Sequence, residues 1–252
     1  MTVDELSKNF NVSQITIRSD LQLLHEDGKI IRTHGGALKI SGSSFDLPLS
    51  VKETRHHEEK YLIGKAALEL IKDGETIIID SGSTTVELAK QIVEKPFKSL
   101  TVITNALNVA MVLSHQSHIQ VVMLGGTLRK MSYSMVGPLA EETLGQLYAD
   151  RLFLGVDGFD IDYGLTTPDI LEARLNRKMI EVSKDIILLT DSSKFGRRSL
   201  SFIANLDMIN IVVTDSNVPS QIFQSLKNMN IGIISVNVDG KWVKKNGEHE
   251  KI

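Results

Sequence analysis

The feature that most constrains the fold is a series of short, almost unbroken apolar runs that recur from Lys52 onward. The runs are TIIID, LTVIT, IQVVML, DRLFLGVD, DIILLTD, NIVVTD and IGIISV. Strands that are covered on both faces have runs of this kind. Because strand and helix patterns alternate, the sequence predicts an α/β domain with a mostly parallel sheet over residues 52–252. A single helix, residues 52–74, is predicted before the first strand, ending at Gly74.

Composition favours a globular protein and restricts its chemistry. Of the 252 residues, 42% are hydrophobic, which is enough for a real core, and none is cysteine. A chain without cysteine has no disulfide, no thiolate metal site and no cysteine nucleophile. No apolar run approaches the roughly 18 residues that span a bilayer, and the N-terminus lacks signal-peptide features. We expect a cytoplasmic protein with no membrane partner.

The first 40 residues have a different pattern, which begins with two short helices. Thr2 and Glu5 have the spacing of a capping box, and Ser13 can cap the second helix, for which Gly28 offers a left-handed stop. The side chains expected on the inward faces of the two helices are Val3, Leu6, Phe10, Ile17, Leu21 and Leu24. After the helices, KIIRTHGGALKI predicts a strand, a Gly35-Gly36 turn and a return strand.

Two helices followed by a hairpin predict a winged helix-turn-helix, whose second helix enters the DNA major groove. Near the start of that helix, polar side chains lie opposite the apolar stripe, as base and phosphate contacts would: Ser13, Gln14, Thr16 and Arg18. An ordinary solvated helix face is the alternative. Residues 1–40 contain five Lys or Arg and five Asp or Glu, so their net charge is only weak support for DNA binding. The predicted domains are residues 1–40 and 52–252, with residues 41–51 as a Ser-, Gly- and Pro-containing linker.

The loop DSGSTT, Asp80 to Thr85, leaves a predicted strand and opens a helix. Free N–H groups at a helix N-terminus, hydroxyl donors and a glycine together favour an anion, and a phosphate ester is the natural candidate. The alternative is that Ser83 or Thr84 simply caps the helix. The loop matches neither a Walker A loop nor the Gly-x-Gly-x-x-Gly fingerprint, so nucleotide binding is disfavoured.

Other polar residues follow successive strands, where ligands bind in open α/β sheets. They are Asn105, Gly125, Gly126, Arg129, Lys130, Asp157, Asp160 and Lys194. Each alone is more often a turn or a cap, but their recurrence favours a site. His115 and His118 have no nearby carboxylate, and no Gly-x-Ser-x-Gly elbow is present, so neither a metal nor a cofactor is predicted.

At VSQITIRSDLQLLHEDGKIIRTHGGA the sequence resembles the DeoR family of bacterial transcriptional regulators. The resemblance extends over nearly the whole chain, through IIIDSGSTT, VITNALNVA, MLGGTLRK, GVDGFD and LLTDSSKFG. It implies a winged helix joined to a sugar-phosphate-sensing domain. Effector phosphate would be bound by Ser81, Gly82, Ser83, Thr84 and Thr85, and the sugar by Asp80, Asn105, Gly125, Gly126, Asp157 and Lys194. Operator DNA would be read by Ser13, Gln14, Thr16 and Arg18, with Arg32, Thr33 and His34 on the wing.

Two departures from the family pattern concern the DNA-binding unit. Family members usually carry another helix before TVDELS, so the winged helix is expected to be truncated, with apolar faces around Leu6, Phe10 and Leu24 partly uncovered. The residue after Arg18, usually basic in the family, is Ser19.

The larger domain also resembles ribose-5-phosphate isomerase, at VDGFD and DSSK. That enzyme's base is a glutamate on a helix resembling EARLNRKMIEV, where this chain has Asn176, Arg177 and Lys178 near the matching point, with Glu172 and Glu181 nearby. We therefore expect no enzyme but a repressor of a sugar-catabolism operon, a homo-oligomer (dimer or tetramer) released from operator DNA by a small phosphorylated sugar. The alternatives are a sugar-phosphate isomerase and an effector-binding oligomer whose DNA-binding unit no longer works.

Overall fold

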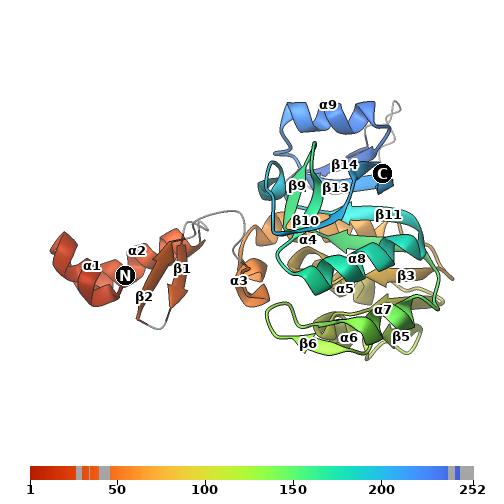
Figure 1. Ribbon diagram of the computed structural model, residues 1–252, viewed down its shortest axis with the longest axis horizontal. Coiled ribbons are helices and arrows are strands. Elements are labelled where there is room, and N and C mark those ends of the chain that lie inside the picture. The colour runs from red at the N-terminus through yellow and green to blue at the C-terminus, as the bar shows by residue number, and fades with distance from the viewer. Residues whose placement is uncertain (27–29, 34, 40–45, 238–241, 245–252) are drawn as a thin grey trace. The chain divides into compact units, whose positions relative to one another are not determined.

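The computed structural model describes residues 1–26, 30–33, 35–39, 46–237 and 242–244, and the chain forms two compact units, Met1–Phe45 and Asp46–Ile252 (Figure 1). Each unit has its own buried apolar cluster. None of the described helices is long and apolar enough to cross a membrane.

The N-terminal unit contains the predicted helix pair and hairpin. Its elements are α1 (Val3–Phe10), α2 (Gln14–Glu26), β1 (Ile30–Thr33) and β2 (Gly36–Lys39). The capping box is present, since the Glu5 N–H donates to Thr2 Oγ1 over 3.1 Å and the Thr2 N–H to Glu5 Oε2 over 2.8 Å. The Thr16 N–H donates to Ser13 Oγ over 3.1 Å, so Ser13 does cap the second helix. Gly28 lies outside the described residues.

The core of this unit is small. Val3, Ile17 and Leu21 are buried, as predicted. Leu6 is partly buried and packs against them. The inward placement of the remaining two was wrong, because Leu24 is 36% exposed and Phe10 is 67% exposed. Among the described residues, nothing packs over these two side chains closely enough to bury them.

The larger unit is built on an eight-stranded sheet of order β15-β14-β13-β11-β8-β3-β4-β5. Its members are β3 (Thr76–Ile79), β4 (Leu100–Thr104), β5 (Ile119–Met123), β8 (Ala149–Gly155), β11 (Ser183–Leu189), β13 (Ile211–Asp215), β14 (Gly232–Val236) and β15 (Trp242–Lys244). Seven strands are parallel and only the edge strand β15 is antiparallel among the described pairings. All seven predicted strands are therefore confirmed, and the fold class is the predicted one.

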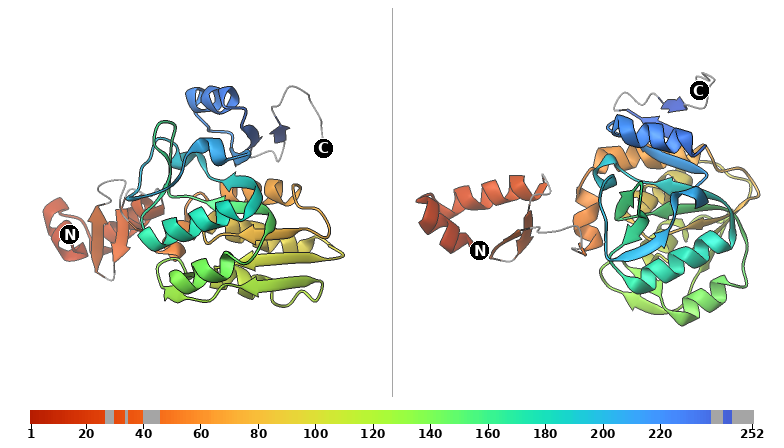
Figure 2. Two further views of the ribbon diagram at one scale, coloured as in Figure 1. Left: turned by 45° about the vertical axis from the view of Figure 1, so that its right-hand side comes forward. Right: turned by 45° about the horizontal axis from the view of Figure 1, so that its top comes forward.

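Helices cover both faces of this sheet (Figure 1, Figure 2). They are α4 (His57–Leu68), α5 (Ser83–Glu94), α6 (Leu107–Leu113), α7 (Pro138–Leu144), α8 (Ile170–Glu181) and α9 (Ser220–Asn228). Ile77 and Ile79 of β3 pack with α4, α5 and α6, whereas Ile78 packs with α7, α8 and α9. Successive strand residues point to opposite faces, so two covered faces require the continuous apolar runs seen in the sequence.

Smaller described elements lie outside the eight-stranded sheet. They are the hairpin β6 (Thr127–Arg129) and β7 (Ser134–Val136), the sheet of β9 (Gly158–Asp160), β10 (Gly164–Thr167) and β12 (Ser201–Ala204), and the short 3₁₀ turns η1 (Ser192–Lys194) and η2 (Leu206–Met208).

The single helix predicted over residues 52–74 is instead two helices, α3 (Leu49–Thr54) and α4. The break occurs at His56, whose φ of 50° is left-handed and cannot continue a helix. The buried Lys60 ammonium donates to the Arg55 carbonyl over 2.5 Å and also to the Lys52 carbonyl, which satisfies the end of α3.

Part of the segment expected as linker packs on the larger unit. Leu49 is 2% exposed, and its N–H donates to the Met131 carbonyl over 2.7 Å. Residues 46–51 therefore belong to the larger unit rather than to a free connection.

Candidate functional site

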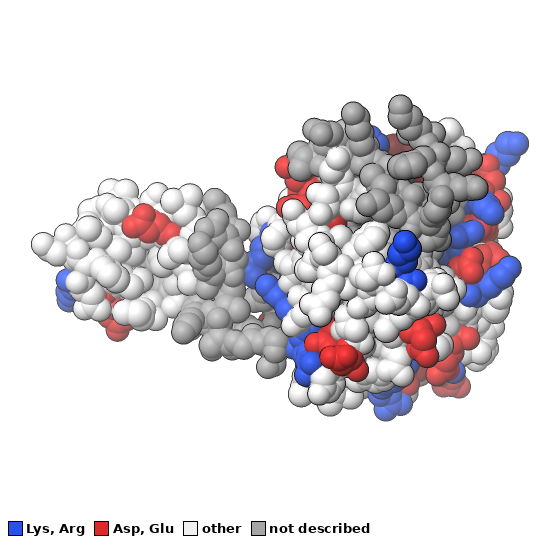
Figure 3. Space-filling view, turned by 90° about the horizontal axis from the view of Figure 1, so that it is seen from above, with Lys and Arg blue, Asp and Glu red and all other residues white. Residues whose placement is uncertain are grey.

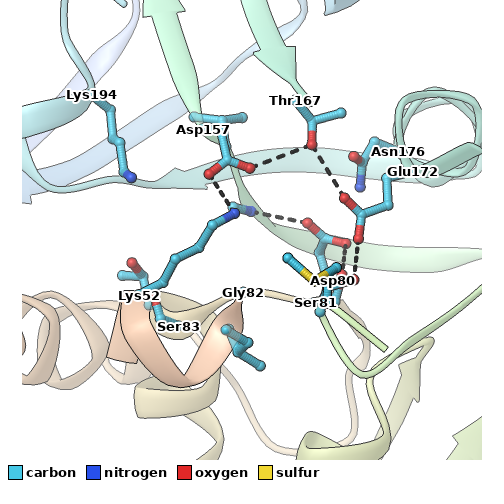
Figure 4. Close-up of a pocket in the computed structure, with 16 residues that line it drawn as sticks. Lys52, Asp80, Ser81, Gly82, Ser83, Asp157, Thr167, Glu172, Asn176 and Lys194 are labelled. Carbon is cyan, nitrogen blue, oxygen red and sulfur yellow. Dashed lines mark hydrogen bonds and ion pairs between the residues drawn. The ribbon is translucent and has the colours of Figure 1, made fainter. Parts of the chain in front are cut away.

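The strand order of the larger unit has a switch point between β3 and β8. From β3 the chain proceeds to β4 and β5 on one side, whereas β8 leads to β11, β13 and β14 on the other. A crevice opens outside the carboxyl ends of strands at such a point, and ligands bind there in open α/β sheets. The structure has a cavity of about 50 Å³ at this position (Figure 4).

Seven parts of the chain line this cavity. They supply Leu49 and Lys52 from α3, Asp80, Ser81, Gly82, Ser83 and Thr84 from the loop after β3 and the start of α5, Met131 and Ser132 from the β6–β7 turn, Gly155, Val156 and Asp157 from the end of β8, Thr167 from β10, Glu172 and Asn176 from α8, and Lys194 from η1. The topology thus gathers residues that are far apart in sequence around one space.

The DSGSTT loop forms one wall and leaves its backbone donors free. Gly82 is the N-cap of α5 and has no side chain to cap it, and no described residue accepts a hydrogen bond from the N–H groups of Gly82, Ser83 or Thr84. Ser83 and Thr84 lie inside the helix, so the alternative that either one is the cap is wrong. The positive end of the helix dipole and these N–H groups form an anion-binding arrangement.

Thr85 does not line the cavity. It is fully buried, and its hydroxyl donates to the carbonyls of Asp80 over 2.7 Å and Gly82 over 3.0 Å. Thr85 therefore holds the loop in shape from behind, which is a supporting role for the predicted phosphate site.

Asp80 lies at the bottom of the cavity and is 2% exposed. Burial, together with the nearby Glu172 carboxylate, raises the pKa of Asp80 to about 7, although hydrogen bonds from Ser81 and Gly155 act in the opposite direction. The Gly155 N–H donates to Asp80 Oδ2 over 3.3 Å, which joins the ends of β3 and β8.

Two cations face the cavity, Lys52 and Lys194 (Figure 4). Lys52 Nζ lies 2.6 Å from Asp157 Oδ1. Burial alone would raise the pKa of Asp157, but Lys52 and Lys194 outweigh it and lower that pKa, so Asp157 is ionised. Within the described part of the chain, the Lys194 ammonium has no hydrogen bond or ion pair, and it remains available to an anion.

Glu172, at the start of α8, has its carboxylate surrounded by donors. Ser134 Oγ donates to Glu172 Oε1 over 3.0 Å, Thr167 Oγ1 to Oε2 over 3.3 Å, and Arg129 NH1 to Oε1 over 3.4 Å. Ser132 makes a fourth contact. Burial still raises the pKa of Glu172. Neither Glu172 nor Lys52 was predicted to bind a ligand, because both lie within helical sequence patterns rather than after strands.

Three residues predicted to contact the sugar are placed elsewhere. Asn105 is 1% exposed and donates to the Met135 carbonyl over 3.4 Å, outside the residues that line the cavity. Gly125 and Gly126 lead into the β6–β7 hairpin, whose turn reaches the cavity only at Met131 and Ser132. Gly126 has a φ of 134°, and a Cβ there would lie 2.6 Å from the Val136 carbonyl oxygen, so its role is conformational.

The predicted DNA-contacting residues gather on the surface of the N-terminal unit. Arg18, Arg32 and Thr33 line a hollow of about 280 Å³ that joins the recognition helix to the wing. Asp4 also lines it, and its Oδ1 accepts from Gln14 Nε2 over 2.6 Å. Ser13, Gln14, Thr16, Arg18, Arg32 and Thr33 are all exposed. His34 lies outside the described residues.

On the face of the larger unit shown in Figure 3, charged side chains form no patch of a single sign. On the face shown in Figure 3, Lys and Arg side chains are interspersed with Asp and Glu side chains. Among the described residues no three His, Asp or Glu side chains gather in a way that could hold a metal ion.

Two family descriptions match this chain. Residues 1–42 match the DeoR-like helix-turn-helix domain, and residues 55–216 match the DeoR C-terminal sensor domain. The chain therefore belongs to the DeoR family of transcriptional regulators, as the motifs predicted.

Similar proteins extend over most of the chain. A protein of Escherichia coli O157:H7, provisionally named as an aga operon transcriptional repressor, is 38% identical over 236 residues, covering 93% of this chain and 87% of its own. The HTH-type transcriptional regulator YulB of Bacillus subtilis strain 168 is 36% identical, with 93% and 90% covered. The glycerol-3-phosphate regulon repressor of E. coli K12 is 33% identical, with 92% and 90% covered. These relatives are named as regulators and not as enzymes.

Among solved structures, a D-ribose-5-phosphate isomerase bound to phospho-erythronic acid overlaps with a TM-score of 0.42 and 19% identity. The overlap covers 55% of this chain and 54% of the isomerase, which is too distant to assign an activity.

Proposed function

We propose that this protein is a transcriptional repressor that binds operator DNA through its N-terminal unit and is released when a phosphorylated sugar binds the switch-point cavity. The observation that carries the proposal is that the N–H groups of Gly82, Ser83 and Thr84 share one cavity with the Lys194 ammonium, and that none of these donors has a hydrogen-bond or ion-pair partner among the described residues. A phosphate dianion matches this set of donors in charge and in hydrogen-bonding capacity.

The other wall of the cavity suits the sugar. The carboxylates of Asp157 and Glu172 and the amide of Asn176 line it, and carboxylates accept hydrogen bonds from hydroxyl groups. A sugar phosphate would thus lie with its phosphate against α5 and its hydroxyl groups against β8 and α8. That placement uses seven of the predicted contacts, which are Asp80, Ser81, Gly82, Ser83, Thr84, Asp157 and Lys194.

Release from DNA requires the effector to bind the DNA-free arrangement more tightly than the DNA-bound one. Operators for helix-turn-helix proteins are usually two-fold symmetric, so we propose a homo-oligomer, a dimer or a tetramer, as the DNA-binding form. The regulated genes would be those of sugar catabolism.

A sugar-phosphate isomerase is the second candidate, and Glu172 is the observation that favours it. An isomerase needs a carboxylate base, and Glu172 lines the cavity with a pKa raised by burial. Its four hydrogen-bond donors, however, stabilise a carboxylate that accepts hydrogen bonds rather than one that removes a proton. Interconversion of ribose 5-phosphate and ribulose 5-phosphate by the purified chain would establish this candidate instead.

The test is a thermal-shift screen against hexose 6-phosphates, amino-sugar 6-phosphates, pentose 5-phosphates, sn-glycerol 3-phosphate and their unphosphorylated parents. A ligand present at 100 times its dissociation constant stabilises the folded state by about 2.7 kcal/mol. We expect one or two phosphorylated compounds to raise the melting temperature and their parents to have no effect.

The variant Ser83→Ala/Thr84→Val removes two hydroxyl donors, and we expect it to weaken binding of the active compound by at least about tenfold. Ser114→Ala, which removes an exposed hydroxyl bonded to the Met111 carbonyl, is the matched control. A screen in which no phosphorylated sugar shifts the wild-type chain would contradict the proposal. A shift without operator binding would instead indicate a regulator whose DNA-binding unit no longer works.

A further inference from the structure

An acidic residue lies on the surface that we expect to bind DNA. Asp4, in the first turn of α1, lines the hollow between the recognition helix and the wing together with Arg18 and Arg32. Asp4 is exposed, and its carboxylate carries the same sign of charge as the phosphates of a DNA backbone. Its charge alone should therefore weaken DNA binding, so the contacts of its side chain decide what Asp4 does there.

The carboxylate of Asp4 contacts the first residue of the recognition helix. Asp4 Oδ1 accepts a hydrogen bond from Gln14 Nε2 over 2.6 Å, which joins the start of α1 to the start of α2. An ionised carboxylate can only accept hydrogen bonds, so the NH₂ group of the Gln14 amide has to face Asp4. Asp4 therefore determines which way the Gln14 amide points.

The oxygen of the same amide faces Arg18. Residues four apart on a helix are neighbours on one face, and Arg18 NH2 donates to Gln14 Oε1 over 3.4 Å. A guanidinium has donors and no acceptor, so it can bond to the amide only through that oxygen. The connection from Asp4 through Gln14 to Arg18 therefore requires one orientation of the amide, and it is the orientation that Asp4 imposes.

A neutral amide between the two charged groups leaves the charge of Arg18 available. Within the described part of the chain Arg18 forms no ion pair with Asp4, so no carboxylate competes with a DNA phosphate for its guanidinium. One N–H of the guanidinium bonds to Gln14, and the others can donate to DNA. A side chain that is already held in place loses less rotamer freedom on binding than a free one.

We propose that Asp4 is a positioning residue for DNA binding, which fixes the Gln14 amide and through it holds the Arg18 guanidinium at the DNA-facing surface. Asp4 then strengthens DNA binding despite its negative charge. Gln14 acts through Arg18 and not only by a DNA contact of its own. This inference rests on the proposed function, because it assumes that the N-terminal unit binds operator DNA.

The variant Asp4→Asn tests the role of the carboxylate. An asparagine amide both donates and accepts, so it no longer imposes one orientation on Gln14. The probe is duplex DNA selected from a random pool by the wild-type chain, and fluorescence anisotropy measures the affinity. We expect binding to weaken about threefold or more, whereas loss of a negative charge alone would strengthen it.

Asp20→Asn is the matched control, since Asp20 is exposed on α2 and lies about 200° around the helix from Arg18. It has the same change in charge and should leave binding unchanged or make it tighter.

A second background separates positioning from a structural role. Asp4 lies in the first turn of α1, where a carboxylate also stabilises the helix through its dipole. In Gln14→Ala the connection to Arg18 is already absent, so adding Asp4→Asn should not weaken DNA binding further. A destabilised α1 would weaken binding equally in the wild-type and Gln14→Ala backgrounds.

The outcomes separate this inference from the proposed function. If Asp4→Asn binds the selected DNA as tightly as wild type or more tightly, or if its weakening persists in Gln14→Ala, the positioning role is overturned while DNA binding stands. If the wild-type chain selects no duplex from the pool, the DNA-binding part of the proposed function fails, and the positioning role fails with it. Weaker binding in Asp4→Asn that is absent both in Asp20→Asn and in the Gln14→Ala background supports both.

Discussion

At the scale of single residues, the structure disfavours the charged form of Asp80. In the unfolded chain this carboxyl ionises near its ordinary pKa of 3.8, whereas burial raises its folded pKa to about 7. Between these values the folded protein holds a proton that the unfolded chain has lost. The free energy of unfolding therefore decreases as pH rises through this window, and the full cost is present above pH 7.

Asp80→Asn removes this titration and should change the pH dependence of stability. We expect the free energy of unfolding of the variant, relative to that of wild type, to increase by about 2–3 kcal/mol from pH 5 to pH 8. Wild type loses stability as Asp80 ionises over that interval, whereas the amide does not titrate. Denaturant unfolding at the two pH values measures this gain. The comparison between the two pH values cancels any pH-independent effect of the amide on stability. If variant and wild type differ in stability by the same amount at pH 5 and pH 8, Asp80 is ionised in the folded protein at both values, which would contradict the raised pKa.

The sequence predicts which side chains lie at the cavity where a strand end determines their position, and it fails to do so elsewhere. Ser81 to Thr84, Asp157 and Lys194 follow strands directly, and the parallel sheet brings those ends together. Asn105 also follows a strand, β4, but that strand is one position away from the switch point, and strand order is not written in a local pattern. Lys52 and Glu172 reach the cavity from helices, so only the tertiary arrangement reveals them.

At the scale of elements, the wing is held by a close backbone approach at Gly36. Met1 and Ala37 exchange backbone hydrogen bonds, with the Ala37 N–H donating to the Met1 carbonyl over 2.9 Å, so the first residues lie beside β2. A Cβ at Gly36 would lie 2.1 Å from the Met1 carbonyl oxygen and 2.8 Å from Thr2 Cα. Only glycine permits this approach.

Gly36→Ala should therefore destabilise the N-terminal unit by about 1–3 kcal/mol, the usual cost of overpacking. We expect reduced DNA affinity, with the effector-induced thermal shift of the larger unit unchanged. Gly35→Ala is the matched control, since a Cβ there would meet nothing within 4 Å. If both variants bind DNA equally well, the contact between the first residues and the wing is not needed.

Elements were predictable from periodicity, except where a tertiary contact overrode it. The seven parallel strands could be read directly from their apolar runs. The break between α3 and α4 could not, because residues 52–74 have helical propensity throughout. The break depends on Lys60, whose buried ammonium binds the carbonyls at the end of α3, and on the docking of Leu49 beneath the β6–β7 turn.

At the scale of the whole molecule, the proposal assigns DNA binding and effector binding to different units, so we expect mutations to separate them. Arg18→Gln removes one exposed cation from the hollow between recognition helix and wing. We expect weaker binding to duplex DNA selected from a random pool by the wild-type chain, and a slope of log affinity against log salt smaller by about 1. Fluorescence anisotropy at several salt concentrations measures both.

Lys178→Gln, an equal change in net charge at a half-buried residue of α8, is the control and should leave the slope unchanged. The thermal shift by sugar phosphate should be the same in wild type, Arg18→Gln and Lys178→Gln. A loss of that shift in Arg18→Gln would mean that the two activities are not confined to separate units.

The most direct test of the account is to titrate a sugar phosphate into the complex of the wild-type chain with its selected DNA. The account predicts that one phosphorylated sugar lowers DNA affinity by at least tenfold, that its unphosphorylated parent does not, and that the sugar phosphate is recovered unchanged. DNA affinity that is independent of every sugar phosphate, or conversion of the sugar during the titration, would contradict it.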